Sequence, residues 1–383
     1  MDILFYGGHY WDRGAWFRKQ QIASRLANRG HRVFYVEDSV SIIRRNSKHK
    51  NQRFQTKVEE IKSNLIIITP SAFLPFPFNK TTRHFSNLKL FYDLKKIFKK
   101  YRATNVMLWF NRLEFSTVLD KFRGIKVIDL CDDLPYYYKL FGNEKAFKLA
   151  NYYLGKALSN TDLQVVSALR IKEKYQKFSK NEMFVMPNGH NLPIGNTEKL
   201  IKPREFENIK GPVIGFLGTL FKFIDDQLLE YIISNRPNYS FVFVGGVEHS
   251  FPIEKIDKYK NFMHLGKKPK SEIQNYINAF DICLNPFKKH EVNDSVSPVK
   301  VFEYLALKKH IVSTEMYSLM REEIADYIIF AKSNEEFLIK LDALVESKDF
   351  VNIVPDSIVQ QYSWDSLIGK LFEQINKRCS ITL

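Results

Sequence analysis

The sequence has little cysteine and no long apolar run. Only Cys131, Cys283 and Cys379 occur, and no two of them form a C-x-x-C pair. Neither a disulfide framework nor a cysteine zinc site is therefore expected. No stretch approaches the ~18 consecutive apolar residues that can span a bilayer, and the first residues show no basic region followed by a cleavage site. These absences argue against a transmembrane or exported chain and predict a protein of the reducing cytoplasm.

Several catalytic signatures are missing as well. The sequence contains no D-x-D metal triplet, no G-x-x-x-x-G-K-[ST] phosphate loop and no H-E-x-x-H zinc helix. The G-x-S-x-G elbow and the G-x-G-x-x-G dinucleotide fingerprint are absent too. A diphosphate site that uses lysine and a helix dipole in place of a metal ion is compatible with these absences.

Length and charge distribution are informative. A chain of 383 residues predicts two domains of roughly 150 residues each. The net charge of +16 is uneven, because residues 1–190 contain 34 Lys and Arg against 16 Asp and Glu, whereas residues 191–383 contain 24 against 26. The basic first half is expected to face a polyanionic surface, either acidic lipid headgroups or nucleic acid, with solubility alone as the simpler alternative.

Strand-like and helix-like segments alternate along the first half. A helix is expected over residues 14–29, ending at Gly30. Strands are expected at residues 3–6, 33–36, 65–69, 106–110, 126–130, 163–166 and 183–186. Runs that are apolar on both faces, separated by helices, are typical of a doubly wound parallel sheet. Residues 1–190 are therefore predicted to form a Rossmann-like domain.

The periodic pattern breaks at Pro187-Asn188-Gly189 and resumes after Gly211. We expect a linker over 191–210, a second Rossmann-like domain over 211–360, and a C-terminal helix over 361–383 that packs back toward the first domain. In the second domain, strands are expected at 213–217, 241–244, 262–265, 282–285 and 311–313, and helices at 224–235, 271–279 and 298–307. The predicted fold class is α/β, with two doubly wound domains facing a cleft, where ligands bind in such folds.

A basic amphipathic helix is expected over residues 80–102. Apolar side chains recur there at helical spacing, and lysines fill other positions, namely Lys89, Lys95, Lys96, Lys99 and Lys100. The preceding segment 70–78 is a proline-broken aromatic loop that cannot be a regular helix or strand. The loop and the lysines are interpreted as a contact with anionic membrane, and the apolar stripe of the helix as core packing.

The run from Ser297 to Ala306 suggests a nucleotide diphosphate site. Ser297 is a preferred N-cap and Pro298 a preferred first helical residue, so a helix should begin here. The helix N-terminus and Lys300 would suit a diphosphate, and Glu303 could accept two hydrogen bonds from a ribose diol. The simpler alternative is a capped surface helix with an i,i+3 ion pair.

A series of short motifs recurs in a fixed order along most of the chain. They are Tyr6-Gly7-Gly8, residues 20–37, Asp129-Leu130-Cys131-Asp132-Asp133, Pro187-Asn188-Gly189, residues 215–219, Arg236-Pro237, and residues 241–245, 264–269, 280–287, 300–306 and 311–314. In this order and spacing they resemble the GT-B glycosyltransferases, specifically the group 1 (family 4-like) enzymes of bacterial surface polysaccharide synthesis, of the teichuronic-acid or xanthan type.

The resemblance implies a nucleotide-sugar site in the second domain and an acceptor site in the first. The donor-binding residues it implies are Gly218, Thr219, Gly245, Ser297, Val299, Lys300 and Glu303. The acceptor-side residues are Gly8, Trp11 and Asp129. Many members carry a glutamate eight residues before the second one, whereas position 295 is Ser here, unless Asp294 or Glu291 substitutes. The E-x7-E pair is incomplete, so inversion and retention both stay open.

An inverting transfer needs a base that takes the proton of the acceptor hydroxyl. Asp132, then Asp133, is the candidate, because both follow a strand and adjacent carboxylates raise each other's pKa. The alternative for this pair is a capped turn before the next helix. His9, in the loop after the first strand, is a rival base or a residue that shapes the pocket.

The sequence thus predicts a cytoplasmic enzyme, peripheral on the inner face of the cell membrane. It would move a hexosyl or glucuronosyl group from a UDP-linked sugar to a lipid-linked or growing polysaccharide acceptor, with no metal or cofactor. The alternatives are an epimerase or phosphorylase of the same fold, or a non-enzymatic polyanion-binding protein. Nucleic acid is not an expected partner, because no recognition motif occurs.

Overall fold

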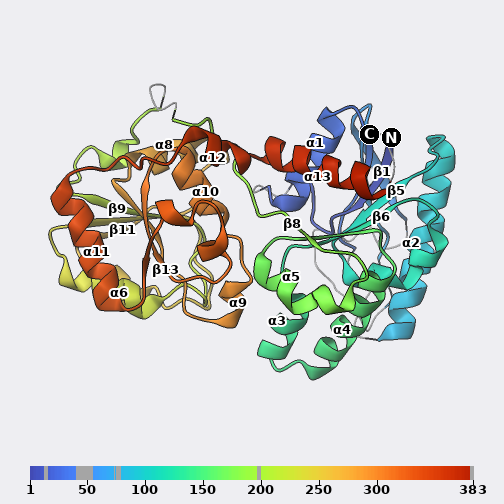
Figure 1. Cartoon of the computed structure of the whole chain (residues 1–383), viewed down its shortest axis with the longest axis horizontal. Coiled ribbons are helices and arrows are strands. Elements are labelled where there is room, and N and C mark those ends of the chain that lie inside the picture. Colours follow the sequence, from blue (N-terminus) through green and yellow to red (C-terminus); the bar gives the residue numbers. More distant parts are fainter. Residues whose placement is uncertain (13–15, 40–54, 73, 75–78, 196–199, 380–383) are drawn as a thin grey trace. The chain divides into compact units, whose positions relative to one another are not determined.

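The computed structural model describes residues 1–12, 16–39, 55–72, 74, 79–195 and 200–379. Its strands form two separate sheets, and the chain divides into a first unit, Met1–Met186 with Ile368–Leu383, and a second unit, Pro187–Leu367 (Figure 1). Each unit is a mainly parallel sheet with helices packed against it, as the alternating pattern predicts.

The first unit contains an eight-stranded sheet with the order β3-β4-β2-β1-β5-β6-β7-β8. Every neighbouring pair is parallel except β3 and β4, which are antiparallel. The strands are β1 (Asp2–Tyr6), β2 (Arg32–Val36), β3 (Lys57–Lys62), β4 (Leu65–Thr69), β5 (Met107–Phe110), β6 (Lys126–Leu130), β7 (Leu163–Val166) and β8 (Phe184–Val185). The helices are α1 (Arg18–Asn28), α2 (Lys80–Lys100), α3 (Leu134–Leu140), α4 (Glu144–Ser159) and α5 (Leu169–Tyr175), with the 3-10 segments η2 (Leu113–Lys121) and η3 (Gln176–Phe178).

The two faces of this sheet have different cores. On one face, α2, η2 and α4 bury a continuous apolar cluster that includes Leu94, Phe115 and Leu154. On the other, the rings of Tyr35, Phe5 and Trp109 stack in a row across β2, β1 and β5, with centroids 5.7 and 5.6 Å apart. Alternate side chains of a strand point to opposite faces, so strands buried on both sides require apolar residues at every position.

The last helix, α13 (Trp364–Cys379), joins the first unit from Ile368 onward. The Arg29 guanidinium lies 5.3 Å from the centre of the Phe372 ring, and Arg378 donates a hydrogen bond to the carbonyl oxygen of Glu182. The helix therefore packs on residues that precede β2 and β8, and Figure 1 shows it beside α1.

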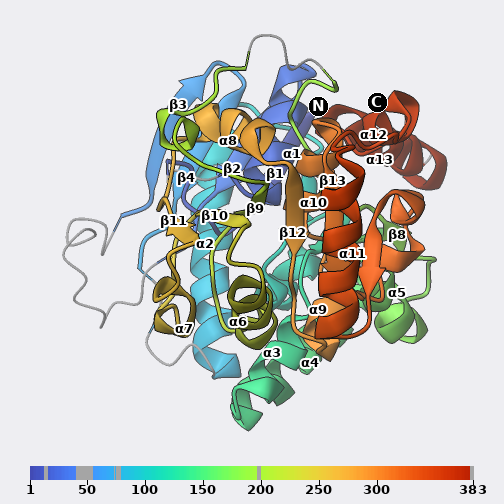
Figure 2. The same cartoon turned by 90° about the vertical axis from the view of Figure 1, so that its left-hand side faces the viewer.

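The second unit contains a six-stranded, all-parallel sheet with the order β11-β10-β9-β12-β13-β14. The strands are β9 (Val213–Leu217), β10 (Ser240–Val244), β11 (Phe262–His264), β12 (Ile282–Asn285), β13 (His310–Thr314) and β14 (Ile329–Ala331). The helices are α6 (Asp226–Asn235), α7 (Glu254–Asp257), α8 (Ile273–Ala279), α9 (Glu291–Asp294), α10 (Val299–Ala306), α11 (Asn334–Ser347) and α12 (Asp356–Gln361), with the 3-10 segments η4 (Arg204–Phe206), η5 (Lys270–Glu272), η6 (Leu319–Arg321) and η7 (Ala325–Tyr327). Figure 2 faces this unit and shows α6 and α11 side by side.

The described residues of the segment 191–210, which was expected as a linker, belong to the second unit. Phe206 is buried, with its ring 6.1 Å from the rings of both Tyr276 and Phe280. The Lys268 ammonium lies 2.6 Å from the Glu205 carboxylate. An aromatic anchor and an ion pair thus hold this segment against the unit, although its sequence shows no helical or strand period.

The helix expected over residues 80–102 is present as α2. Its apolar stripe is buried at Phe91 and Leu94 but not at Phe85, which is 57% exposed. Leu90, Leu94 and Ile97 are buried, whereas Lys96, Lys99 and Lys100 are exposed. In the preceding aromatic loop, residues 73 and 75–78 lie outside the described residues. Within the described part of the chain, no helix combines the length and apolar character that a membrane span requires.

Candidate functional site

Two glycine loops lie side by side at the carboxyl edge of the second sheet. Gly218 follows β9 and Gly245 follows β10, and these strands are neighbours. Their φ angles are +135° and +149°, which side chains rarely adopt. A methyl group at Gly245 would lie 1.9 Å from the carbonyl oxygen of Gly218. Glycine is therefore required at Gly245 for the two loops to approach each other.

A hydrogen bond fixes α10 against the end of β9. The Leu217 backbone N–H donates to the Tyr304 hydroxyl at 2.7 Å, and Tyr304 is fully buried. Because Tyr304 lies on α10, this bond sets the distance between the helix and the Gly218 loop. The first turns of α10 are thereby held beside the two glycine loops.

Ser297 is not the N-cap of α10. The cap position is Pro298, which has no side-chain hydrogen bond to offer, and the helix begins at Val299. The Ser297 hydroxyl instead accepts from the Asn188 backbone N–H at 2.9 Å, and the Asn188 side-chain amide donates to the Ser297 carbonyl at 2.7 Å. Ser297 therefore ties the Pro187-Asn188-Gly189 segment to the start of α10, and no serine side chain blocks the helix N-terminus.

Lys300 is held by aromatic rings rather than by a carboxylate. Its ammonium lies 3.9 Å from the centre of the Phe216 ring and 5.1 Å from that of Phe287. A methyl group at Gly218 would lie 3.1 Å from the same nitrogen. Among the described residues, Lys300 Nζ makes no hydrogen bond or ion pair. Burial lowers the pKa of Lys300 to about 7, and Glu303 opposes the shift.

Glu303 lies one turn further along α10 and is partly buried. Burial raises its pKa to about 7, against the opposing effects of Lys270 and Lys300. A lysine and a glutamate three residues apart thus both have pKa values shifted toward neutrality, a feature that clusters at functional sites. The i,i+3 ion pair of the simpler alternative is not formed between Lys300 and Glu303.

Two other expected donor residues, Thr219 and Val299, have exposed side chains. Ser295 is buried, and the neighbouring Asp294 accepts a hydrogen bond from the Tyr317 backbone N–H at 3.1 Å. Glu291 is exposed at the start of α9. The Asp294 carboxylate therefore has a structural partner, which does not favour it as a substitute for the missing glutamate.

At the carboxyl edge of the first sheet, the Lys19 ammonium acts on both His9 and Asp132. Lys19 Nζ lies 3.4 Å from His9 Nε2, and its charge lowers the pKa of both His9 and Asp132. Burial is the largest cause for His9 and brings its pKa to about 4. For Asp132, desolvation by the surrounding protein outweighs Lys19 and raises the pKa, although the side chain is exposed.

Asp133 has the capping role that was the alternative to catalysis. One carboxylate oxygen accepts from the Tyr136 backbone N–H at 3.1 Å, so Asp133 is the N-cap of α3. The carboxylate also lies 2.6 Å from Lys174 Nζ and 2.5 Å from the Tyr175 hydroxyl. Asp133 is buried with both oxygens engaged, so the two adjacent aspartates are not equivalent.

The expected acceptor-side residues are mostly internal. Asp129 is buried in an ion pair with Arg18, whose Nε lies 3.0 Å from one carboxylate oxygen and 3.1 Å from the other. Trp11 is 6% exposed, with its ring 5.0 Å from that of Tyr35. Gly8 has φ +70°, and a methyl group there would lie 2.7 Å from the Arg112 side chain. Trp11 and Gly8 thus belong to the packing of the loop after β1, and Asp129 is occupied by Arg18 of α1.

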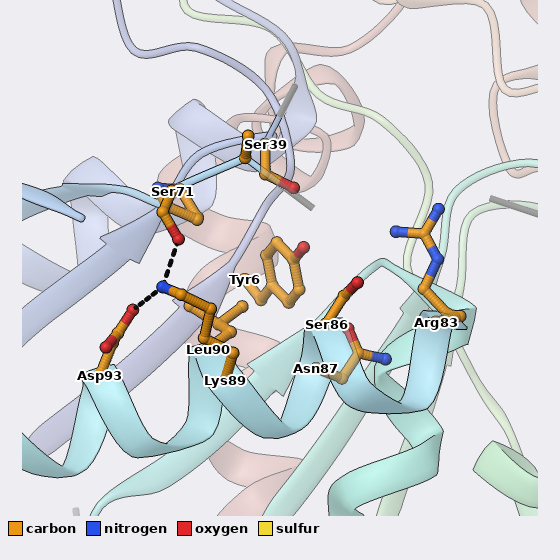
Figure 3. A pocket seen from close by; sticks show the side chains of 11 residues that line it. Tyr6, Ser39, Ser71, Arg83, Ser86, Asn87, Lys89, Leu90 and Asp93 are labelled. Atoms are coloured by element: carbon orange, nitrogen blue, oxygen red, sulfur yellow. Dashed lines mark hydrogen bonds and ion pairs between the residues drawn. The ribbon is translucent and has the colours of Figure 1, made fainter. Parts of the chain in front are cut away.

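Figure 3 shows a polar pocket at the same edge of the first sheet. Tyr6 at the end of β1, Ser71 after β4, and Arg83 of α2 contribute to its lining. Lys89 Nζ lies 2.5 Å from the Ser71 hydroxyl and 2.9 Å from the Asp93 carboxylate. The cavity of about 20 Å³ has room for about one water molecule. It is too small for a sugar ring.

Sequence reasoning did not single out Lys19 or Lys270. Lys19 lies in the first turn of α1. Only the structure shows that it lies near His9 and acts electrostatically on Asp132, which makes it a candidate site residue. Lys270 follows β11 in the sequence, and its charge lowers the pKa of Glu303. No group of three metal-ligating side chains occurs within the ranges that the structure describes.

No model of a known protein family matches the chain. Among curated proteins, it is similar to TuaH of Bacillus subtilis (strain 168), which is named as a teichuronic acid biosynthesis glycosyltransferase, with 24% identity over 142 residues. The matched segment spans 36% of this chain and 36% of that relative.

Solved structures match nearly the whole chain. Sucrose-phosphate synthase from Thermosynechococcus elongatus aligns with a TM-score of 0.69 and 12% identity, over 98% of this chain and 100% of that one. HepE from Anabaena, solved in complex with UDP and glucose, aligns with a TM-score of 0.64 and 13% identity, over 98% and 99%. Likeness at such identities concerns architecture, and together with the two parallel sheets it shows that this chain has the GT-B fold, as its sequence motifs predict.

Proposed function

We propose that this chain is a glycosyltransferase that transfers a sugar from a UDP-linked donor to a lipid-linked or growing polysaccharide acceptor. The observation that carries the proposal is the Lys300 ammonium. It is partly buried, its pKa is lowered to about 7 although Glu303 opposes the shift, and within the described residues it forms no ion pair. A buried cation without a counter-ion is unfavourable, and an anionic ligand would reverse that penalty.

The surroundings of Lys300 favour a diphosphate. Lys300 lies in the first turn of α10, and a methyl group at Gly218 would be 3.1 Å from its nitrogen, so the glycine leaves the ammonium open on that side. Backbone N–H groups at a helix N-terminus bind phosphate oxygens, and the helix dipole adds a favourable term. Glu303, one turn beyond, is placed to accept two hydrogen bonds from a ribose diol. The UDP bound to the similar HepE protein supports uridine as the nucleoside.

In the proposed reaction, the acceptor hydroxyl oxygen attacks the anomeric carbon of the donor sugar. The bond from that carbon to the diphosphate oxygen breaks, and UDP leaves with the electron pair. Lys300 would stabilise the negative charge on the departing diphosphate. The hydroxyl proton must pass to a base, and we propose Asp132, because its carboxylate is exposed and its pKa is raised. Whether the configuration is inverted or retained is open.

We further propose that the first unit docks on an anionic membrane surface, where a lipid-linked acceptor would be found. On α2, Phe85 and Tyr92 are both 57% exposed, and Lys96, Lys99 and Lys100 are exposed beyond them along the helix. Exposed aromatics suit the interfacial region of a bilayer, and lysines suit acidic headgroups. This arrangement supports peripheral binding without a membrane span.

Donor binding and transfer can be tested with the purified full chain. Isothermal titration calorimetry with UDP, GDP and CDP should show selective binding of UDP, and mass spectrometry with a panel of UDP-sugars and membrane extracts should detect a glycosylated lipid. Change of a UDP-sugar into its epimer without acceptor would favour an epimerase. Phosphate-dependent release of a sugar phosphate would favour a phosphorylase. Absence of nucleotide binding would overturn the proposal.

A further inference from the structure

A large groove opens at the opposite edge of the first sheet from His9 and Asp132. Its volume is about 840 Å³, within the roughly 300–1,000 Å³ range of ligand pockets. Met107, which begins β5, and Ile125, which precedes β6, line it. His9 and Asp132 follow the carboxyl ends of β1 and β6. A molecule in this groove would therefore lie at the amino ends of the strands, away from the proposed chemistry.

The lining of the groove is mainly apolar, with His31 and Asn105 as its uncharged polar side chains. Phe91 and Phe98 lie two turns apart on α2, and Phe122 comes from the segment that follows η2. Phe91 and Phe122 form an edge-to-face pair with ring centroids 5.2 Å apart. Phe91 and Phe122 are only 7% and 8% exposed and Phe98 is partly buried, so a small part of each ring borders the groove, where it offers a hydrocarbon chain an apolar contact.

The rim of the groove is cationic. Lys95, Lys121 and Arg123 line it and are exposed, and none of the described residues that line it is acidic. The Lys121 ammonium is 4.0 Å from the Asp120 carboxylate, which is 72% exposed, so that pair is weak. Arg123 has no ion pair or hydrogen bond among the described side chains. The rim is thus complementary to an anion.

We propose that this groove binds one acidic phospholipid from the membrane surface. The acyl chain would lie against the three phenylalanine rings, and Lys95, Lys121 and Arg123 would bind the phosphate. A mainly apolar lining together with a cationic rim matches an anionic amphiphile better than a soluble anion, which would leave the apolar part of the groove unfilled. Lys95 also joins the groove to the exposed lysines of α2, so a bound lipid could remain at the bilayer surface.

The inference rests on the proposed membrane association and not on the donor site. Dihexanoyl-phosphatidylglycerol, kept below its micelle concentration, is the probe, and dihexanoyl-phosphatidylcholine is its neutral counterpart. Binding to the full-length protein is measured by ligand-observed NMR. We expect saturable binding of the acidic lipid and at least tenfold weaker binding of the neutral one.

Two variants test the groove, and a third variant serves as a matched control. Lys121→Glu combined with Arg123→Glu should weaken binding of the acidic lipid at least tenfold. Val106→Trp should fill the groove, since Val106 is partly exposed and lines it. Lys177→Glu combined with Lys180→Glu makes the same charge change at exposed positions of the same unit and should leave lipid binding unchanged. Thermal unfolding and calorimetric UDP binding show that each variant is folded.

The outcomes distinguish the proposed lipid groove from the proposed membrane association. Equal binding of both lipids, or full binding by the Lys121→Glu and Arg123→Glu variant, would overturn the groove assignment even if the protein still sediments with acidic liposomes. Displacement of the lipid by inorganic phosphate alone would also overturn the groove assignment, because the acyl chain would then contribute nothing to binding. If the wild-type protein binds neither the probe nor acidic liposomes, the proposed membrane association is wrong as well. The proposed UDP site is tested independently, by calorimetry.

Discussion

The Lys300 ammonium faces the Phe216 ring at 3.9 Å, and this contact takes the place of an ion pair. A cation–π contact contributes about 0.5–2 kcal/mol, whereas a hydrogen bond to a charged group contributes about 1.5–3 kcal/mol. The ring can therefore hold the side chain in position without competing strongly with a diphosphate. The position of Lys300 is set before a donor arrives, which reduces the ordering entropy that binding must overcome.

Truncation of Lys300 or Glu303 should weaken donor binding. Lys300→Ala and Glu303→Ala each remove a charged partner, and we expect a loss of about 1.5–3 kcal/mol in UDP affinity for each. Isothermal titration calorimetry measures it. Lys260→Ala removes an exposed lysine of the same unit and should leave UDP affinity unchanged. Wild-type affinity in both site variants would exclude α10 from the donor site.

Donor binding should be coupled to proton uptake at one pH and to proton release at another. At pH 8, Lys300, with a pKa of about 7, is mostly neutral, and a bound diphosphate raises that pKa, so the complex should take up a proton. At pH 6, Glu303, with a pKa of about 7, is mostly protonated, and hydrogen bonds from a diol favour its charged form, so a proton should be released. Affinity should therefore be highest near pH 7.

Calorimetry of a UDP-sugar in buffers of different ionisation enthalpy measures these protons. A UDP-sugar is preferred to UDP because its diphosphate has no terminal phosphate that titrates in this range. Lys300→Arg keeps the charge but stays protonated at pH 8, so it should abolish the uptake there. Uptake of the same size in Lys300→Arg and in wild type would contradict the assignment.

Gly245→Ala should disrupt the glycine loops. The substitution places a methyl group 1.9 Å from the Gly218 carbonyl oxygen at a φ of +149°, and we expect a destabilisation on the order of 2 kcal/mol or more together with weaker UDP binding. Gly155, inside α4, has no atom within 4 Å of a methyl group placed there. Gly155→Ala should stabilise the fold by about 0.5–1 kcal/mol. Chemical denaturation compares the two.

The adjacent aspartates should separate into a catalytic and a structural role. Asp132→Asn should abolish sugar transfer and leave UDP affinity intact, since its exposed carboxylate caps no helix. Asp133→Asn should cost about 1–3 kcal/mol of unfolding free energy, because it weakens the bonds to Lys174 and Tyr175. Turnover and denaturation are measured on both variants. Normal turnover of Asp132→Asn would place the base elsewhere, with His9 the next candidate.

Charge reversal on α2 should release the protein from acidic membranes. Each basic residue near the surface contributes about 1 kcal/mol, and salt screens it within about 8 Å. Sedimentation with acidic liposomes should be lost on reversal to Glu of Lys95, Lys96, Lys99 and Lys100. It should persist on reversal of four exposed lysines of the second unit, Lys202, Lys210, Lys260 and Lys332. Equal sedimentation of both variants would show that α2 is not the docking face.

Buried strands were predictable because both of their faces require apolar residues. The expected bounds 65–69, 126–130, 163–166, 213–217 and 282–285 coincide with those of β4, β6, β7, β9 and β12. β3 was not predicted, because its sequence KVEEIK is mostly charged and most of its residues are exposed. A strand at the edge of a sheet is defined by its backbone hydrogen bonds to a neighbour, which leave no period in the side chains.

Within the candidate site, spacing in the sequence was informative where one helix carries both residues. Lys300 and Glu303 are one turn apart on α10, so their proximity follows from the helix itself. The cap was less predictable, because Ser297 has a partner at Asn188 that is distant in the sequence. Asp132 and Asp133 look alike in the sequence, and only the position of Lys174 and Tyr175 distinguishes them.

The charges of β3 also decide how the first sheet ends. One side of β3 pairs with β4, and the other side leaves backbone N–H and C=O groups without a strand beside them among the described residues. Lys57, Glu59, Glu60 and Lys62 are exposed along this edge. A second copy of β3 that paired here in register would bring like charges together and desolvate them, which opposes edge-to-edge aggregation. This protection would matter most under the proposed membrane association, because crowding in two dimensions favours such pairing.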